Sequence, residues 1–195
     1  MNNDMKGLRQ ECLGCRKCDI GGAEVSGMPS NVFSNMNCDA KVMIVGQNPG
    51  MEEVIRGEPF VGHSGRIFDE AMKSIGVSRK DLYISNTVKC YTPGNRKPKR
   101  FEVDNCRCFL DREIEIIKPN VIVALGGPAF KQLTGMNGIT KHHGTVLFSP
   151  RYMVPVIPML HPSPLNTNNP VKREMFNEDV LALRLFLDSK KEQDG

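Results

Sequence analysis

Short apolar runs alternate with amphipathic segments along this chain. Residues 41–46 form a continuous apolar run that ends at Gly46, which is typical of a strand covered on both faces. Three further runs predict buried strands, at 82–88, 121–125 and 153–160. Pro155 and Pro158 in the last run favour an edge or irregular strand, because proline lacks the N–H that a sheet ladder uses.

Apolar residues at helical spacing separate these runs. The spacing predicts helices over 63–75 and 99–118, a short helix after Gly126 that ends near Leu133, and a final helix over 171–187. The polar tail, 188–195, is expected to fray. Strands separated by helices predict an α/β fold: a three-layer α/β/α sandwich around a central four-stranded, mostly parallel sheet.

The composition fits one domain. The chain has 195 residues and 39% hydrophobic content, enough for a core without staples, so we expect a single domain over 1–195 with an N-terminal cysteine segment. No run approaches the roughly 20 apolar residues of a membrane span. The first residues also lack the pattern of a secretory signal. We therefore expect a cytoplasmic protein, and a monomer.

The charge balance is mildly basic. The 26 Lys and Arg residues outnumber the 22 Asp and Glu residues, which gives a net charge of +4. Four basic residues lie within five positions beside glycine and prolines: Arg96, Lys97, Lys99 and Arg100. A loop of this kind can reach a phosphate backbone, and an ordinary solvated loop is the alternative.

Seven cysteines in a chain expected to work in a reducing compartment favour metal binding or catalysis over disulfides. Cys12, Cys15 and Cys18 form a C-x2-C-x2-C run, while Cys90 and Cys106 lie near the end of a predicted strand and on the next predicted helix. Four thiolates from these two regions can hold a zinc ion or an iron–sulfur cluster, and the spacing alone does not choose.

Within this set, Cys15 and Cys18 are the better N-terminal pair, because Ile20 can anchor their loop in the core. Cys12 is the reserve ligand. We expect Cys38 and Cys108 to be structural, since buried cysteines also behave as small apolar residues.

Four short polar or glycine-rich motifs follow the predicted strands. They are GQNPG at 46–50, PFVGHSG at 59–65, NTVKC at 86–90 with PGNRKP at 93–98, and HPS at 161–163. Together and in this order they resemble the motifs of the iron–sulfur, or family-4, uracil-DNA glycosylases. The resemblance implies a DNA repair hydrolase that cuts the N-glycosidic bond of uracil in single- or double-stranded DNA and leaves an abasic site.

The resemblance also implies a cofactor and a ligand set. Family members carry a four-cysteine 4Fe–4S cluster, which here falls on Cys15, Cys18, Cys90 and Cys106. This favours iron–sulfur over zinc. The cluster is expected to be structural, tying the N-terminal segment to the loop and helix that follow Cys90.

A glycosylase must flip the nucleotide out of the helix and read the base edge. Phe60 matches the family residue on which the base stacks, Asn86 offers an amide to the uracil edge, and His161 matches the donor to the departing base. Their ordinary alternatives are a core aromatic, a capping asparagine and a surface histidine. The substrate-binding set also includes Gly46, Ser163 and Leu165, with Leu165 as a wedge in the minor groove.

The chain departs from its family at Gln47, where glutamate is usual. Glutamine cannot act as a base. Asn48 resembles the water-orienting asparagine in the GINPG motif of mismatch-specific uracil and thymine glycosylases, so we assign water positioning to Asn48 and contact with base or water to Gln47. The missing base predicts slow turnover. It also favours the alternative function, a catalytically weakened homologue that binds DNA or uracil.

A related branch traps uracil covalently with an added histidine in the loop before the last strand. KHHG at 141–144 occupies that region. The chain lacks that branch's longer loop, so we do not expect covalent trapping.

Overall fold

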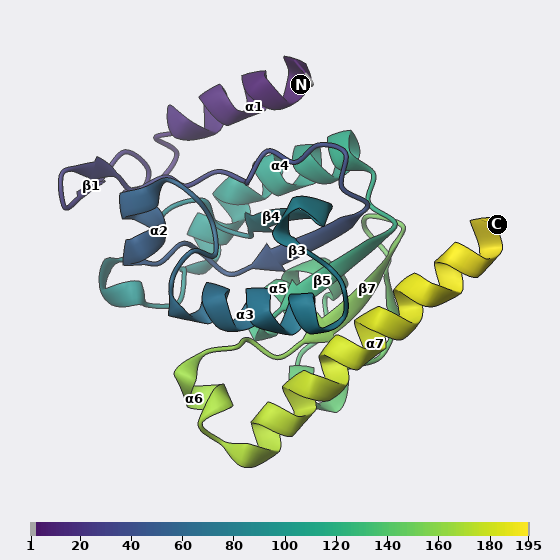
Figure 1. Cartoon of the computed structure of the whole chain (residues 1–195). Helices are drawn as coiled ribbons and strands as arrows, with labels where there is room; N and C mark the ends of the chain where they lie inside the picture. The colour runs from purple at the N-terminus through teal and green to yellow at the C-terminus, as the bar shows by residue number, and fades with distance from the viewer. Residues whose placement is uncertain (1–2, 195) are drawn as a thin grey trace.

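The computed structural model describes residues 3–194 (Figure 1) and contains two sheets. The large sheet has the strand order β4-β3-β5-β7-β6. Its strands are β3 (Val42–Gly46), β4 (Leu82–Asn86), β5 (Val121–Leu125), β6 (Leu147–Ser149) and β7 (Val154–Met159). The pairs among β4, β3, β5 and β7 are parallel, and β6 runs antiparallel to β7. A separate hairpin pairs β1 (Glu24–Val25) with β2 (Met28–Pro29).

The predicted number of strands is wrong by one, because β6 makes the sheet five-stranded. β6 has only three residues and a partly exposed burial pattern, so no apolar run marks it. The prediction of an edge position for β7 is also wrong, since β7 pairs with β5 on one side and β6 on the other. Pro155 lies opposite Phe148, and Pro158 lies opposite Ala124. Each proline removes one donor, and the other residues keep both ladders.

The described residues form seven α-helices. They are α1 (Asn3–Leu13), α2 (Met51–Arg56), α3 (His63–Ser74), α4 (Arg100–Ile117), α5 (Gly127–Thr134), α6 (Pro164–Thr167) and α7 (Pro170–Asp194). The four predicted helices are confirmed as α3, α4, α5 and α7, whereas α1, α2 and α6 were not predicted. The expectation of a frayed tail is wrong as far as Asp194, because α7 continues through it. Gly195 lies outside the described residues.

Two buried clusters lie on the two faces of the sheet. Alternate side chains of β3 face opposite ways, so Met43 and Val45 join the cluster with α1, α4 and α5. Val42 and Ile44 join the cluster with α3 and α7. Figure 1 shows α3 and α7 on the near side of the sheet and α4 behind it. The three-layer α/β/α architecture is therefore confirmed.

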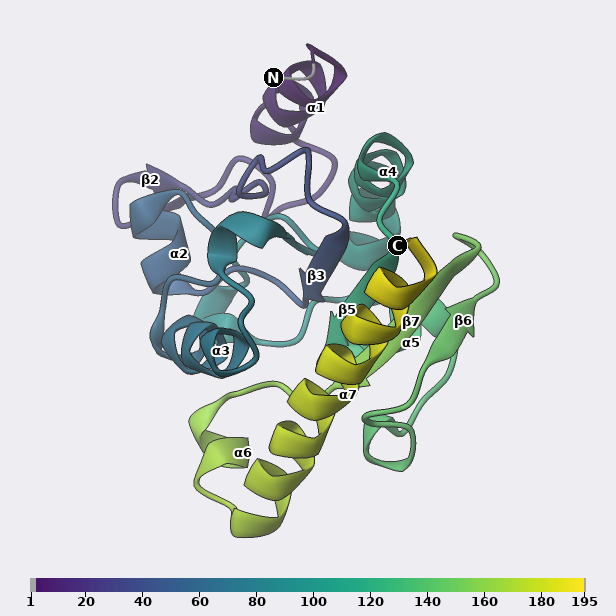
Figure 2. The same ribbon diagram turned by 45° about the vertical axis from the view of Figure 1, so that its right-hand side comes forward.

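The segment after β7 and the N-terminal helix α1 lie at opposite ends of the protein. Figure 2 shows α6 and the first turns of α7 extending beyond the strands, so the loop after β7 projects from the body of the protein. At the other end, α1 packs on α4, where Glu11 and Arg112 form an ion pair. None of the helices in the described part of the chain combines the length and the apolar character that a bilayer span requires.

Candidate active site

The carboxyl ends of four parallel strands meet at one edge of the sheet, which is where open α/β sheets bind ligands. Gly46, the last residue of β3, pairs in register with Asn86, the last residue of β4. At the end of β5, the Gly126 N–H donates to the carbonyl of Met159 in β7 (2.9 Å). The loops after these strands therefore bring the predicted site segments to the same place.

Gly46, Phe60 and Asn86 meet at this edge. A Cβ atom on Gly46 would lie 2.5 Å from Asn86 Oδ1 and 2.5 Å from the Phe60 ring, so only glycine fits. The Asn86 side chain is buried, and its Oδ1 has no hydrogen-bond partner among the described residues. A buried acceptor without a donor costs about 1–3 kcal/mol. Such an atom beside an aromatic ring is a place for a ligand that carries an N–H.

The backbone of Phe60 is held in an unusual conformation. Its φ of 55° lies in the left-handed region, which costs a non-glycine residue about 1–3 kcal/mol. A Cβ on Gly65 would lie 2.0 Å from the Phe60 carbonyl oxygen, so the glycine at the start of α3 allows the close approach. Glu53 Oε1 accepts the N–H groups of Val61 (3.0 Å) and Gly62 (2.7 Å) just after the ring. The neighbouring helices thus fix the Phe60 ring in place.

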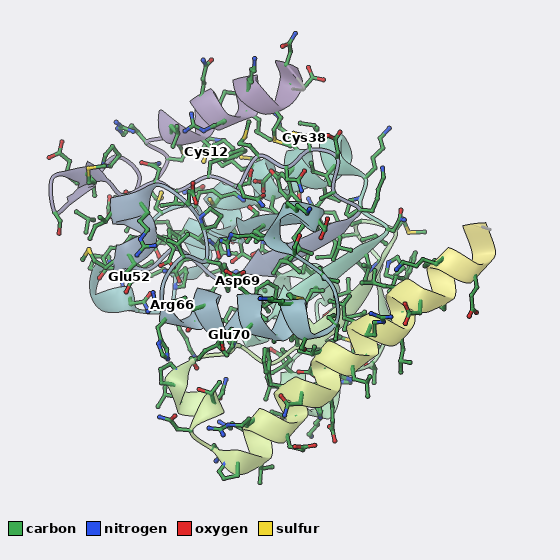
Figure 3. The ribbon with its side chains drawn as sticks, viewed as in Figure 1. Cys12, Cys38, Glu52, Arg66, Asp69 and Glu70 are labelled. Carbon is green, nitrogen blue, oxygen red and sulfur yellow. The ribbon has the colours of Figure 1, made fainter. Side chains whose placement is uncertain are left out.

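The two acidic side chains closest in sequence to Gln47 are engaged elsewhere. The remaining oxygen of Glu53 accepts the Gly50 N–H (2.9 Å). Glu52 forms an exposed ion pair with Arg66 (3.4 Å), and both are labelled in Figure 3. Glu53 therefore serves as a structural carboxylate, a role that the sequence analysis missed although a glutamate three residues after Gly50 is a recognisable capping pattern.

His161 lies beside Phe60, with 5.9 Å between the ring centroids. Burial lowers the pKa of His161 below its ordinary value, and the charge of Glu53 opposes this shift. The imidazole is therefore neutral at neutral pH. The His161 carbonyl accepts the Ser163 N–H (2.8 Å) and the Asn166 side-chain amide (2.8 Å), which fixes the backbone of the HPS motif.

Gln47 and Asn48 bond to each other. Gln47 Nε2 donates to Asn48 Oδ1 (2.7 Å), and Asn48 Nδ2 donates to the Pro49 carbonyl (3.0 Å). Asn48 Nδ2 also lies 3.3 Å from Thr92 Oγ1 and 3.3 Å from Asn95 Oδ1. The Asn48 amide is thus held between its neighbour and the PGNRKP loop, with a free lone pair on Oδ1.

A cavity of about 240 Å³ opens beside these residues. Gln47, Gly126, Leu160, His161 and Asn166 are part of its wall. Phe60 and Asn86 do not line it. The Phe60 ring contacts the His161 ring, and Phe60 and Asn86 both lie against Gly46. The structure therefore places Phe60 next to both His161 and Asn86, while Gln47 and His161 share the cavity wall.

The segment after His161 carries an exposed apolar side chain. Ser163 precedes α6, and Leu165 lies within it with 86% of its surface exposed. No other large apolar side chain among the described residues is more exposed. A leucine held out on a short helix is suited to insertion between bases.

The basic segment behaves differently from its prediction in one respect. Arg96 forms a bidentate pair with Glu102 through both terminal nitrogens (2.9 and 2.6 Å), so it is not free to bind phosphate. Lys97 and Lys99 remain exposed, and the Arg100 side chain, at the start of α4, is 97% exposed. Three of the four predicted basic side chains therefore stand in solvent.

A second cavity collects cysteines from the two predicted regions. Its wall includes Cys12, Cys15, Cys18, Cys90 and Cys106. Two of the sulfurs accept hydrogen bonds, Cys106 from the Lys89 N–H (3.2 Å) and Cys90 from Asn31 Nδ2 (3.5 Å). Cys38 and Cys108 are half-buried and do not line this cavity (Cys12 and Cys38 are labelled in Figure 3).

This donor set fits a cluster. Within residues 3–194 no three His, Cys, Asp or Glu side chains converge closely enough to hold a single metal ion. A 4Fe–4S cluster makes a different demand, because its ligands are four separate cysteine thiolates around a larger group. Cysteines distributed around a common cavity meet that demand.

His142 and His143 do not line the cavity that contains His161. The His142 ring packs on Phe130, with 5.6 Å between the centroids. His143 Nδ1 lies 2.7 Å from a carboxylate oxygen of Asp179.

Comparison with known proteins finds a matching family model and several similar proteins. The family model described as the uracil DNA glycosylase superfamily matches residues 33–184. The chain is 36% identical over 177 residues to a type-4 uracil-DNA glycosylase of Archaeoglobus fulgidus, covering 87% of this chain and 86% of that protein. It is 40% identical over 162 residues to a type-4 uracil-DNA glycosylase of Thermotoga maritima, covering 80% and 82%. A type-4 uracil-DNA glycosylase of Sulfurisphaera tokodaii is 32% identical over 190 residues, covering 93% and 84%.

Proposed function

This chain belongs to the uracil-DNA glycosylase superfamily, among its type-4 enzymes, and we propose how its own residues remove uracil from DNA. The enzyme is a DNA repair hydrolase that cuts the N-glycosidic bond of uracil and leaves an abasic site. The proposal concerns the residues that bind the base, assist its departure and position water, and the cluster that supports them.

The base binds against Phe60 and Asn86. The observation that carries this proposal is the buried Asn86 Oδ1, which lacks a donor and lies beside the Phe60 ring at the Gly46 backbone. Uracil carries an N–H on its Watson–Crick edge, so it can satisfy this acceptor, while its flat face stacks on the ring. Cytosine has no N–H at the same ring position, which makes the pairing selective for the deaminated base.

His161 assists the departure of the base. Breaking the glycosidic bond leaves negative charge on uracil, and a donor placed at a uracil oxygen stabilises that charge. A neutral imidazole has one N–H to give, and burial keeps His161 neutral. The bonds to its carbonyl fix the backbone, so the donor is in place before the reaction begins.

Asn48 positions the attacking water. Its Nδ2 is bound to the PGNRKP loop, and Oδ1 already accepts one N–H from Gln47. The second lone pair of Oδ1 can accept a hydrogen bond from water and orient that water toward the sugar. The hydrogen bond from Gln47 holds Asn48 in this orientation, and Gln47 also lines the cavity, where it contacts the base or the water. DNA approaches over the exposed Leu165, which fills the space left by the extruded base.

Cys15, Cys18, Cys90 and Cys106 would hold a 4Fe–4S cluster, which supplies a structural link. All four line the cysteine cavity. Cys12 also lines it, but it belongs to the buried apolar face of α1 together with Met5 and Leu8. We therefore assign Cys12 to the core. The link ties the N-terminal segment to the strand end that carries Asn86.

The oligomeric state and the cellular location of the enzyme are part of the same proposal. We propose a single-domain monomer that acts in the cytoplasm, where a reducing environment keeps cysteine side chains available as cluster ligands. Native mass spectrometry tests the monomer, since a dimer would double the mass.

The direct test is excision from DNA. The purified enzyme is incubated with a uracil-containing oligonucleotide, and alkali then cleaves any abasic site. We expect cleavage at the uracil position only, and no cleavage of the matching oligonucleotide with thymine or cytosine. Binding without any cleavage would instead establish a DNA-binding homologue that lacks turnover.

Restoring a carboxylate at Gln47 should accelerate the enzyme. A Gln47→Glu variant places a carboxylate in the cavity wall, where it can act as a general base toward the attacking water. General-base assistance is worth about 10²–10⁴-fold when fully developed, so we expect at least a tenfold rise in the single-turnover rate. Gln47→Ala is the control and should not gain. A Gln47→Glu rate equal to or below that of the parent would contradict the assignment.

Cluster binding should depend on Cys90 and not on Cys38. The Cys90→Ser variant removes one proposed ligand, so the purified protein should lose the visible absorption of an iron–sulfur cluster together with most of its bound iron. Cys38→Ser, which lies outside the cysteine cavity, should keep both. Equal iron content in the two variants would refute the proposed ligand set.

A further inference from the structure

Asp179 on α7 is a buried carboxylate with two bonds. Its side chain is fully buried, and its Oδ2 accepts the backbone N–H of Leu160 (2.7 Å). Its Oδ1 lies 2.7 Å from His143 Nδ1. Burial raises the pKa of Asp179 to about 6, and both hydrogen bonds oppose that shift. A buried carboxylate is costly unless it is hydrogen-bonded, so these two bonds explain why it is tolerated.

Three segments converge on this carboxylate: α7, the loop before β6, and the end of β7. Gly144, next to His143, donates its N–H to the Pro158 carbonyl (3.0 Å). A Cβ on Gly144 would lie 3.3 Å from Asp179 Oδ1, so the loop packs closely against the carboxylate. His143 therefore approaches Asp179 from a loop that is itself fixed to β7.

The bonded N–H belongs to the residue directly before His161. Asp179 holds the Leu160 N–H on one side of the imidazole, while Ser163 and Asn166 hold the His161 carbonyl on the other. The ring between these anchors contacts Phe60 and lies against Gly126. The orientation of the donor to uracil thus depends on the backbone that Asp179 fixes.

We propose that His143 and Asp179 form a positioning pair for His161. His143 Nδ1 donates to the Asp179 carboxylate and keeps it oriented toward the Leu160 N–H. His143 Nε2 faces the more exposed Glu178 at 3.9 Å. The pair touches neither DNA nor base, so its effect reaches the reaction only through the place of His161. The inference rests on the proposed role of His161.

The expected consequence is a loss of rate without a loss of binding. A displacement of about 1 Å in a reacting group can cost about 10²-fold in rate. Removing the His143 side chain leaves the Leu160 N–H bonded to a carboxylate that has lost one of its two anchors. We therefore expect His143→Ala to lower the single-turnover rate of excision by about tenfold. DNA binding should stay within about twofold, because the pair lies beneath the site.

The test compares three variants in the full-length enzyme. His143→Ala should lose rate. His143→Asn, whose side-chain amide can donate in place of Nδ1, should recover most of it. His142→Ala removes the neighbouring histidine, which packs on Phe130 instead, and should behave like the parent. Rates are measured in single turnover, and affinity is measured with an oligonucleotide carrying an uncleavable 2′-fluorinated deoxyuridine. Thermal unfolding reports whether each variant is folded at the assay temperature.

Two results would overturn the inference. One is a His143→Ala rate equal to that of the parent. The other is an equal loss in His142→Ala and His143→Ala, which would indicate a general disturbance of the loop. The proposed function fails separately, by full activity of His161→Ala. If His143→Ala keeps the parental rate while His161→Ala is inactive, the positioning pair is refuted and the proposed role of His161 stands.

Discussion

Replacing His161 with alanine is expected to lower the single-turnover rate of uracil excision by about 10²–10³-fold, the usual cost of removing one preorganised donor to a developing negative charge. The imidazole is half-buried and neutral, and its backbone is fixed on both sides of the ring. The imidazole therefore needs to move little when negative charge develops on the base. Affinity for uncleavable uracil DNA should change little, since the bond strengthens in the transition state.

His142→Ala is the matched control for this prediction, because it removes an imidazole that does not line the cavity. Its rate should equal that of the parent. A rate for His161→Ala within about threefold of the parent would show that the departing base finds its donor elsewhere.

Replacing Lys89 with methionine is expected to cost about 3–5 kcal/mol of unfolding free energy. Lys89 and Glu113 form an ion pair in which the side chains are 1% and 0% exposed. The Lys89 ammonium also donates to Ser85 Oγ (2.5 Å) and to the Asn86 carbonyl (2.8 Å). Removing the cation leaves the Glu113 carboxylate buried without its counter-charge, so the thermal midpoint should fall by about 10 °C.

The double variant Lys89→Met with Glu113→Leu tests whether the loss comes from the unpaired charge of Glu113. Replacing both charges with apolar groups should recover much of the lost unfolding free energy. The attraction between two buried charges is largely offset by the cost of removing them from water. Lys97→Met, at an exposed position, should shift the midpoint by little. An equally small shift for Lys89→Met would contradict the assignment of a buried charge pair.

Much of the site follows from sequence because parallel strands bring their carboxyl ends together. Gly46 and Asn86 end neighbouring apolar runs, and the structure pairs them in register. The cysteine cavity likewise unites the two cysteine regions that spacing indicates. These are contacts between ends of regular elements, and the hydrophobic pattern marks such ends.

Other contacts depend on how side chains approach in three dimensions. Nothing in the pattern around Glu53 shows that it binds the loop after Phe60, or that Asp179 on α7 reaches Leu160. The sequence presents Arg96 as a free basic residue, whereas in the structure α4 places Glu102 beside it. β6 escapes prediction because it has only three residues, and its buried residue is a serine while its phenylalanine is exposed.

The most direct test of the site is a crystal structure of the enzyme with free uracil, the reaction product. The proposal predicts the base stacked on Phe60, with its N–H within hydrogen-bond distance of Asn86 Oδ1 and an oxygen facing His161. Uracil bound in a place where it contacts none of these three side chains would contradict the proposal.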